Sequence, residues 1–336
     1  MKRHQKQRKS VKAVKHWEEL TLIKSIRKHK TVKHKDVLIG IGDDTAVVDS
    51  IGGEKLLYTV DSIVDGIHFL GNGYWRSAGK RAIGAAASDI AAMGGVPLYA
   101  LLSLFLPKAL PLKCIDEFMD GFFQRLKAFN IALIGGNITT MNGKFAADTM
   151  VIGKSYRGRF VTRSGAKIGD AVCMLGVTGE AMAGLDLLLS NKKALYPKLI
   201  KRYLEPTPML KESIMVVEAL KPNAMIDVSD GLIQDLMHIA EESRVGVVLD
   251  LDSIPVTEPV RDTARLMKKS PYDYVLTGGD DYVLLFTVPE HRYKTYVNGM
   301  KVYKIGKIVQ TKGIKFYKDG KRVSITLKKQ GYVHGA

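Results

Sequence analysis

Acidic residues gather where apolar runs of this chain end, and one group is dense. The stretch AMIDVSDGLIQDL, residues 224–236, holds Asp227, Ser229, Asp230 and Asp235. Other apolar runs end at Asp43 and Asp44, at Asp61, at Asp89, and at Asp280 and Asp281. Open α/β folds place their sites at such element ends. Because Mg²⁺ prefers oxygen ligands and often bridges carboxylates and nucleotide phosphates, the pattern favours metal-assisted phosphoryl transfer.

Each acidic motif also has a purely structural interpretation. Ser229 or Asp230 could simply cap a helix, and the Asp43–Asp44 pair after a glycine is ordinary turn chemistry. The recurrence of acidic residues at the ends of apolar runs favours a metal site over the structural interpretation, because carboxylates beside apolar surface are costly without a counter-charge. Lysine and arginine are scarce next to these motifs, so a cation from solution is the simplest counter-charge.

The familiar nucleotide-binding signatures are incomplete in this sequence. GIGDDT, residues 40–45, begins like a dinucleotide-binding loop but lacks its last glycine. The Gly153–Ser155 segment resembles the end of a phosphate-binding loop, yet Asp148 stands where that loop needs a glycine. A nucleotide would therefore have to be bound by another device, such as the carboxylates.

The hydrophobic periodicity predicts an α+β chain with two halves. In the first half we expect helices over 16–30, 74–93 and 113–129, and strands over 37–41, 46–48, 55–63, 98–106, 132–134 and 149–153. In the second half we expect helices over 180–190 and 209–219 and from residue 231, and strands over 171–177, 224–228, 245–251, 283–288 and 303–308. The polar, basic stretch 154–166 lies between them, so we expect a basic tail 1–17, an N-terminal domain 18–158 and a C-terminal domain 159–336.

The net charge of +17 belongs to the two ends of the chain. Residues 1–35 carry +11 and residues 301–336 carry +9, while the 265 residues between them carry −3. A basic end is most simply a solvated tail, and the main alternative is a contact with nucleic acid. No recognition motif accompanies the charge, so a nucleic-acid-binding protein is the non-enzyme alternative and not the favoured function.

The cysteines and the longest uncharged run indicate the compartment. Cys114 and Cys173 form no CxxC motif, which excludes a disulfide framework and a cysteine-type zinc site and suits a reducing compartment. The uncharged run 90–107 is interrupted by Gly94, Gly95 and Pro97, which favours a turn and a buried strand over a membrane span. We therefore expect a cytoplasmic protein with no membrane partner.

The same motifs resemble those of the thiamine-monophosphate kinases, a family of the aminoimidazole ribonucleotide synthetase superfamily. The resemblance covers about residues 18–332 and is carried by IGDDTAVV, DSIVDGIHF, SDIAAMGGVPLYALLSLFLP, GGNITT, TRSGAKIGD, GEAMAGLDLLL, YLEPTPML, MIDVSDGLIQDLMHIAEES, LTGGDDYVLLFTVP and a final GY. It implies two domains, each a mixed sheet covered by helices, and a homodimer joined through the N-terminal domains. It also implies direct phosphorylation of thiamine monophosphate to thiamine diphosphate, with ATP as co-substrate, several Mg²⁺ ions and no covalent phospho-enzyme.

The resemblance also implies roles for individual residues. The implied metal ligands are Asp44, Thr59, Asp61, Asp89, Asp227 and Asp230. The residues implied to face the nucleotide are Gly136, Asn137, Arg163 and Ser229, and those implied to face the thiamine substrate are His68, Asp280 and Tyr332. From the sequence pattern alone, His68 is more simply a half-buried histidine, Arg163 a solvated residue and Tyr332 an anchor for the C-terminal segment.

The chain departs from the family pattern at three of these motifs. Val60 stands where threonine is common, so only its backbone carbonyl could serve as a ligand. Asn137 replaces an aspartate and removes one negative charge, and Asp280 replaces a glutamate that is one methylene longer.

Related enzymes of the superfamily fit the sequence less well. Selenophosphate synthetase would need a cysteine near the N-terminus, and the hydrogenase-maturation relative would need one at the C-terminus; this chain has neither. Aminoimidazole ribonucleotide synthetase, acting on another small substrate, stays as the alternative enzyme.

Overall fold

The computed structural model describes residues 19–28, 32–50, 52–190 and 192–325. The chain divides into two compact units, one of residues 1–32 with 333–336 and one of residues 33–332. In the first unit, helix α1 (Glu19–Lys28) falls within the helix predicted over 16–30. Its last turn carries Arg27 and Lys28, where cations interact favourably with the helix dipole. The predicted tail 1–17 and Tyr332 lie outside the described residues.

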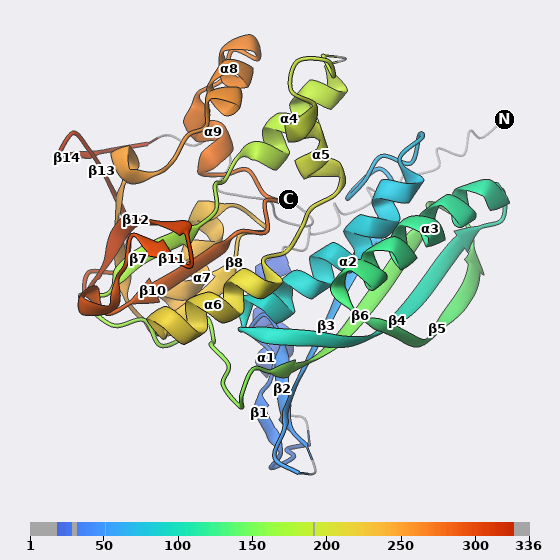
Figure 1. The fold of residues 1–336 in the computed structure, drawn as a ribbon, viewed down its shortest axis with the longest axis horizontal. Helices are drawn as coiled ribbons and strands as arrows, with labels where there is room; N and C mark the ends of the chain where they lie inside the picture. Colours follow the sequence, from blue (N-terminus) through green and yellow to red (C-terminus); the bar gives the residue numbers. More distant parts are fainter. Residues whose placement is uncertain (1–18, 29–31, 51, 191, 326–336) are drawn as a thin grey trace, which may run out of the picture. The chain divides into compact units, whose positions relative to one another are not determined.

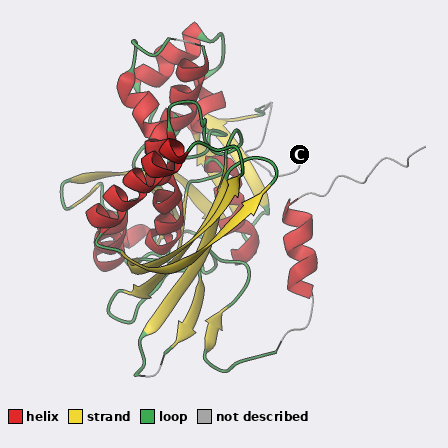
Figure 2. Cartoon of the chain, turned by 90° about the vertical axis from the view of Figure 1, so that its right-hand side faces the viewer, coloured by secondary structure: helices red, strands yellow, loops and turns green. Residues whose placement is uncertain are grey.

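The second unit begins with a six-stranded mixed sheet (Figure 1). Its strand order is β1 (Val37–Ile39), β2 (Ala46–Asp49), β3 (Lys55–Val64), β6 (Ala146–Ser155), β4 (Gly95–Pro107) and β5 (Ala132–Met141). Neighbouring strands are antiparallel except β4 and β5, which are parallel. Helices α2 (Trp75–Ala92) and α3 (Leu112–Phe129) pack together and cover one face of the sheet (Figure 2).

Small residues allow α2 and α3 to pack closely. A Cβ atom at Gly79 of α2 would overlap the carbonyl oxygen of Phe118 in α3, and one at Gly121 would overlap the carbonyl oxygen of Arg76. Helix α2 also contacts α5, α6 and β8 of the second half. This helix therefore lies between the first sheet and the elements that follow, and side chains at its C-terminal end can reach both.

The second half is built on an eight-stranded sheet. The strand order is β14 (Lys321–Val323), β13 (Gly313–Lys318), β9 (Gly246–Asp250), β12 (Met300–Val309), β7 (Ala171–Leu175), β10 (Leu284–Val288) and β8 (Ala224–Asp227), and β11 (Tyr296–Val297) pairs with β12. Among the described strands of this sheet, β9 and β13 are parallel and the other neighbours are antiparallel. The helices are α4 (Glu180–Leu189), α5 (Pro197–Leu204), α6 (Leu210–Leu220), α7 (Leu232–Ser243), α8 (Glu258–Leu266) and α9 (Pro271–Val275), with short turns at Leu251–Ser253 and Glu290–Arg292.

Both faces of this sheet are buried. Val172 and Met174 of β7 belong to one apolar core with α4 and α7, whereas Cys173 belongs to a second core with α6. Strands buried on both faces are apolar throughout rather than alternating, which explains why β7, β8 and β10 appear as continuous apolar runs. Burial also raises the pKa of the Cys173 thiol to about 12, so the thiol stays protonated and packs as an apolar residue.

The structure confirms the predicted α+β class, with two mixed sheets covered by helices. The predicted boundary at residue 158 falls between β6 and β7 and stays a prediction. Three helices (α5, α8 and α9) and three strands (β11, β13 and β14) were not expected from the periodicity. Strand β5 continues to Met141 although its GGNITT segment is polar and exposed, because hydrogen bonds to β4 hold it.

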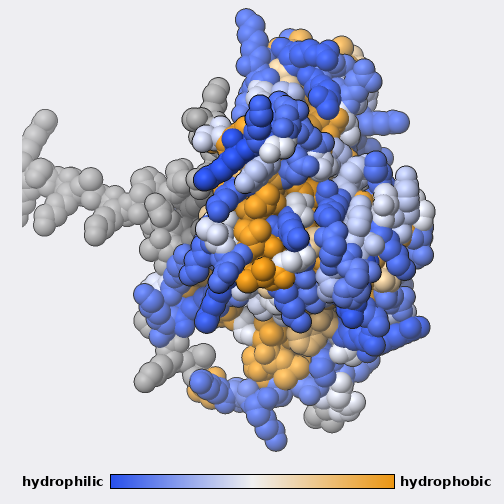
Figure 3. All heavy atoms as spheres, turned by 90° about the vertical axis from the view of Figure 1, so that its left-hand side faces the viewer, coloured by the Kyte–Doolittle hydropathy of each residue, from blue (hydrophilic) through white to orange (hydrophobic). Residues whose placement is uncertain are grey.

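The surface seen in Figure 3 is mostly hydrophilic, with apolar residues gathered in the middle of the face. Among the residues that the structure describes, no helix is long and apolar enough to span a membrane.

Candidate active site

Three aspartates from separate segments meet beside helix α2. Asp44 comes from the turn before β2, Asp89 from α2 and Asp227 from the end of β8. One carboxylate oxygen of each lies within 4.8 Å of the others. Asp44 is 7% exposed and Asp227 is 1% exposed. We call these three residues the aspartate cluster.

The Ser88–Asp89 pair of α2 connects the cluster to both halves of the molecule. The Ser88 hydroxyl donates to Asp227 Oδ2 at 2.5 Å. The Thr59 hydroxyl of β3 donates to Asp89 Oδ2. Asp61 is two residues along β3 from Thr59 and lies on the same face of the sheet. The structure therefore joins three of the six predicted metal ligands in the cluster and places Thr59 and Asp61 next to it.

Burial and mutual repulsion make these carboxylates hard to ionise. Burial, and then the charge of Asp44, raise the pKa of Asp61 to about 6 and that of Asp227 to about 7. Burial and the charges of Asp61 and Asp227 raise the pKa of Asp89 well above its ordinary value. A nearby cation would reverse these shifts, because it stabilises the ionised form.

Arg163 supplies part of the missing positive charge. Its Nη2 and Nε donate to Asp44 Oδ1 at 2.6 and 3.1 Å, and its backbone N–H donates to the Asp43 carboxylate at 3.1 Å. Burial and the charge of Asp44 raise the pKa of Asp43 to about 7. The other Asp44 oxygen, Oδ2, is buried and has no hydrogen-bond partner among the described residues. A buried carboxylate oxygen without a donor is the position a metal ion would satisfy.

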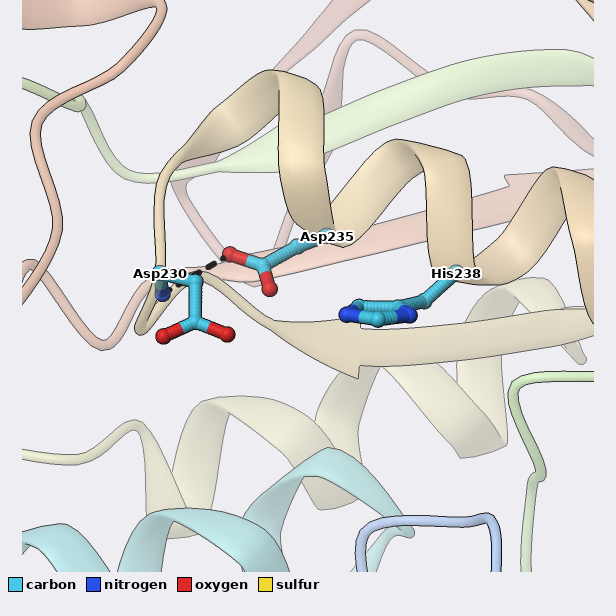
Figure 4. A group of neighbouring side chains, drawn as sticks. All are labelled: Asp230, Asp235 and His238. Atoms are coloured by element: carbon cyan, nitrogen blue, oxygen red, sulfur yellow. Dashed lines mark hydrogen bonds between the residues drawn. The ribbon is translucent and has the colours of Figure 1, made fainter. Parts of the chain in front are cut away.

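The loop after β8 folds around one carboxylate oxygen. Asp235 Oδ2 accepts the backbone N–H groups of Ser229, Asp230 and Gly231 at 3.1, 3.2 and 3.0 Å. Figure 4 shows Asp235 beside the Asp230 backbone, with the Asp230 carboxylate directed away from it. Gly231 has φ 125°, a conformation that favours glycine.

Asp230, the sixth predicted ligand, joins a second group. It lies with Asp235 and His238, each offering one ligand atom within 4.8 Å of the others. The motifs assigned no role to Asp235 or His238. Their spacing in the sequence could have identified them, because residues three apart in a helix share one face.

Two of the predicted substrate residues lie near the N-terminal half of α2. His68 lines a small pocket with Tyr74, Arg81 and Tyr203. The Val64 N–H donates to His68 Nδ1 at 3.0 Å, so the neutral ring carries its proton on Nε2. Asp280 forms an ion pair with Arg81.

Gly136 and Asn137 lie away from the aspartate cluster. Along the sheet, Asp61 is opposite Thr149, Thr149 is opposite Leu102, and Leu102 is opposite Gly136. Three strand spacings separate β3 from β5, about 14 Å. Asn137 is exposed and donates to the Thr139 hydroxyl at 3.1 Å. One copy of the chain does not bring these two residues to the cluster.

The chain is similar to known proteins over nearly its whole length. Family models of the N-terminal and C-terminal domains of AIR synthase related proteins match residues 42–155 and 167–319. Thiamine-monophosphate kinase of Aquifex aeolicus is 35% identical over 286 residues, covering 84% of this chain and 90% of the relative. The Escherichia coli K12 thiamine-monophosphate kinase is 34% identical over 313 residues, covering 90% and 93%.

A solved structure described as AaThiL complexed with AMPPCP and TMP has the same fold. Its TM-score is 0.82 at 34% identity, and the match covers 94% of this chain and 97% of that one.

Proposed function

The chain belongs to the thiamine-monophosphate kinase family, and on that premise we propose that it transfers the γ-phosphoryl group of ATP to thiamine monophosphate. The products would be thiamine diphosphate and ADP. The observation that carries the proposal is the aspartate cluster, in which one buried Asp44 oxygen has no hydrogen-bond partner in the described part of the chain. The names of similar proteins support the reaction class, and the aspartate cluster would supply the residues for it in this chain.

The donor set fits Mg²⁺. Asp44, Asp89 and Asp227 supply carboxylate oxygens at one point, and Thr59 and Asp61 lie beside them. This is an oxygen-only set, which is the preference of a hard divalent cation. Bound there, Mg²⁺ would neutralise phosphate charge and favour in-line transfer without a covalent phospho-enzyme.

The protein groups around the cluster would bind and orient the nucleotide. Arg163 directs two donors of its guanidinium to one oxygen of Asp44. A guanidinium at this point suits a phosphate, because it can donate two parallel hydrogen bonds to it. The Ser229–Gly231 loop, fixed from behind by Asp235, would present the Ser229 side chain to the nucleotide and the Asp230 carboxylate to a cation.

We further propose that the chain acts as a homodimer joined through the face of the first sheet that α2 and α3 do not cover, called the uncovered face below. Val60, Tyr99 and Met150 are exposed by 58%, 45% and 37%. Val60 is opposite Met150 in register, and Met150 is opposite Leu101, so apolar side chains form a row across three strands. Contiguous exposed apolar surface of this kind is typical of an interface.

The dimer would also explain the position of Gly136 and Asn137. Asn137 is opposite Ser103, which is opposite Asp148, and Asp148 is opposite Ser62 on the same uncovered face. Because this face is turned away from α2, Asn137 cannot serve the cluster of its own subunit. Asn137 of the partner subunit is then the one that would face the nucleotide.

The test is product formation by the purified protein with ATP, Mg²⁺ and thiamine monophosphate, followed by chromatography. Wild-type protein should make thiamine diphosphate and ADP in equal amounts. Asp227→Asn should lose at least about a hundredfold in rate, because it removes a ligand and leaves Ser88 paired with an amide. Asp262→Asn, on α8 and bonded only to Tyr196 and Arg265 among the described residues, is the matched control.

Each negative result has its own meaning. If the protein binds ATP in a Mg²⁺-dependent way but forms no thiamine diphosphate, the proposed acceptor is wrong. Another small-molecule acceptor is then favoured. Loss of both binding and product would reject the kinase proposal.

A further inference from the structure

Arg81 is a buried cation of α2 that reaches the second half of the molecule. It is 4% exposed. Its Nη1 donates to the Tyr203 carbonyl oxygen at 2.7 Å, and its guanidinium lies 5.1 Å from the centre of the Tyr203 ring. Its Nη2 pairs with Asp280 Oδ1. Three contacts therefore fix the orientation of the guanidinium, as a buried arginine requires.

Asp280 is held by its backbone as well as by Arg81. Its φ is 67°, in the left-handed region that non-glycine residues rarely adopt, and Tyr282 has φ 51°. The Asp280 N–H donates to the Ser229 carbonyl oxygen at 2.8 Å, and the Tyr282 N–H donates to that of Val228 at 2.8 Å. Backbone strain of this kind clusters at functional sites, where surrounding contacts hold it.

The two oxygens of Asp280 have different surroundings. Oδ1 is engaged by Arg81 and accepts the Tyr282 hydroxyl at 3.3 Å. Oδ2 has no hydrogen bond from any residue that the structure describes, and the side chain is 33% exposed. Arg81 also lies in the narrow crevice that contains His68, a residue that the family resemblance assigns to the acceptor. Asp280 thus has one carboxylate oxygen held by Arg81 and a second that no described residue engages, on a side chain that is partly exposed.

We propose that Arg81 is the positioning residue of the acceptor site, holding Asp280 so that Oδ2 receives a cationic heteroaromatic acceptor. The thiazolium ring of thiamine monophosphate carries the positive charge that such an oxygen would select. The proposal rests on the function proposed above and deepens it. It assigns to Arg81 the selection of the acceptor and no part in binding ATP.

The reach of the two side chains offers a sharp test. An arginine is one bond longer than a lysine from Cβ to its terminal nitrogen, and an aspartate is one bond shorter than a glutamate. The variants are Arg81→Lys, Asp280→Glu and the two combined. Because one substitution shortens the pair and the other lengthens it, the double variant would span the same total distance as the native pair. The control is Lys80→Met, which changes a residue of the same helix α2 and removes its 3.0 Å pair with Glu205, the residue after α5.

The experiment measures steady-state KM for thiamine monophosphate, KM for ATP and the thermal midpoint. Arg81→Lys should raise the acceptor KM by about ten- to a hundredfold, the cost of one displaced charge-assisted hydrogen bond, and leave the ATP KM within about twofold. The double variant should recover most of the loss, which two independent changes would not do. Lys80→Met should change neither KM.

Equal increases in both KM values, or no recovery in the double variant, would overturn the proposal and leave Arg81 a structural bridge between the two halves. If wild-type protein makes no thiamine diphosphate, titration of thiamine monophosphate by calorimetry, with AMPPCP present, replaces the KM. Binding that Arg81→Lys weakens would then support the acceptor site even though the proposed reaction had failed. No binding to wild-type protein would overturn both.

Discussion

Asp61 and Asp227 bind protons more tightly in the folded chain than in the unfolded chain. Their pKa values rise from 3.8 to about 6 and about 7. Between about pH 4 and pH 7 the folded state therefore binds more protons than the unfolded state, and the free energy of unfolding should fall as pH rises. The contribution of these two protonated carboxyls to the free energy of unfolding is complete below about pH 4 and is lost progressively as pH rises through their folded-state pKa values.

Mg²⁺ should oppose this loss. The ion binds ionised carboxylates, so its stabilising effect should be larger at pH 7.5 than at pH 5.5. Thermal unfolding at both pH values, with and without Mg²⁺, measures the effect, and Asp227→Asn should reduce the difference. Equal stabilisation by Mg²⁺ at both pH values would contradict the assignment of the cluster as the metal site.

Arg163 is expected to act on the nucleotide and on Asp44. Arg163→Lys keeps the charge but loses the fork of two donors to Asp44 Oδ1. We expect the KM for ATP to rise about tenfold with little change in the acceptor KM. Arg157→Lys is the control, because its pair with Glu218 is exposed and contributes little. An unchanged ATP KM in Arg163→Lys would assign the residue to structure alone.

At the scale of elements, the position of α2 decides whether the site forms. Its Ser88–Asp89 pair bonds to both halves, so a shift of the helix would separate the ligands. Gly79→Ala places a methyl group against the Phe118 carbonyl and should cost about 1–3 kcal/mol or more of unfolding free energy. Gly40→Ala, where a Cβ would meet no atom of the described residues within 4 Å, should be neutral or slightly stabilising. Urea unfolding of both variants measures this, and equal stabilities would contradict close α2–α3 packing.

The sequence predicted elements best where one local pattern was enough. The small-residue helix α2 and the apolar strands β4, β7, β8 and β10 follow from composition and periodicity. Helices α5 and α8 are short and rich in charge, and β5 is polar, so only tertiary contacts define them. At the site, the sequence predicted the aspartates, because each of these aspartates follows the end of an apolar run. The motifs could not find Arg81 or the role of Asp235, because those depend on which segments the fold brings together.

At the scale of the whole molecule, the dimer proposal makes a prediction about subunits in trans. Asn137→Ala and Asp227→Asn should each be nearly inactive alone. Mixed and allowed to exchange subunits, they should form some sites with a native Asp227 in one subunit and a native Asn137 in the other. About a quarter of the wild-type activity should return. No recovery, with exchange shown by differently tagged subunits, would mean that Asn137 serves its own subunit or none.

A charge on the uncovered sheet face should prevent association. Met150→Lys places an ammonium group in the apolar row with Val60 and Leu101, so the chain should elute as a monomer in size-exclusion chromatography with light scattering. The exposed Lys144→Met, outside that row, should leave the mass unchanged. A wild-type protein that is already monomeric at micromolar concentration would contradict the dimer.

The most direct test of the central claim follows the phosphoryl group itself. ATP labelled with ³²P at the γ position is incubated with the protein, Mg²⁺ and thiamine monophosphate, and the products are separated. The proposed function predicts label in thiamine diphosphate, no transfer when Mg²⁺ is chelated, and no transfer by Asp227→Asn. Label found only in inorganic phosphate, or transfer that persists without a divalent cation, would contradict a metal-assisted transfer to thiamine monophosphate at the aspartate cluster.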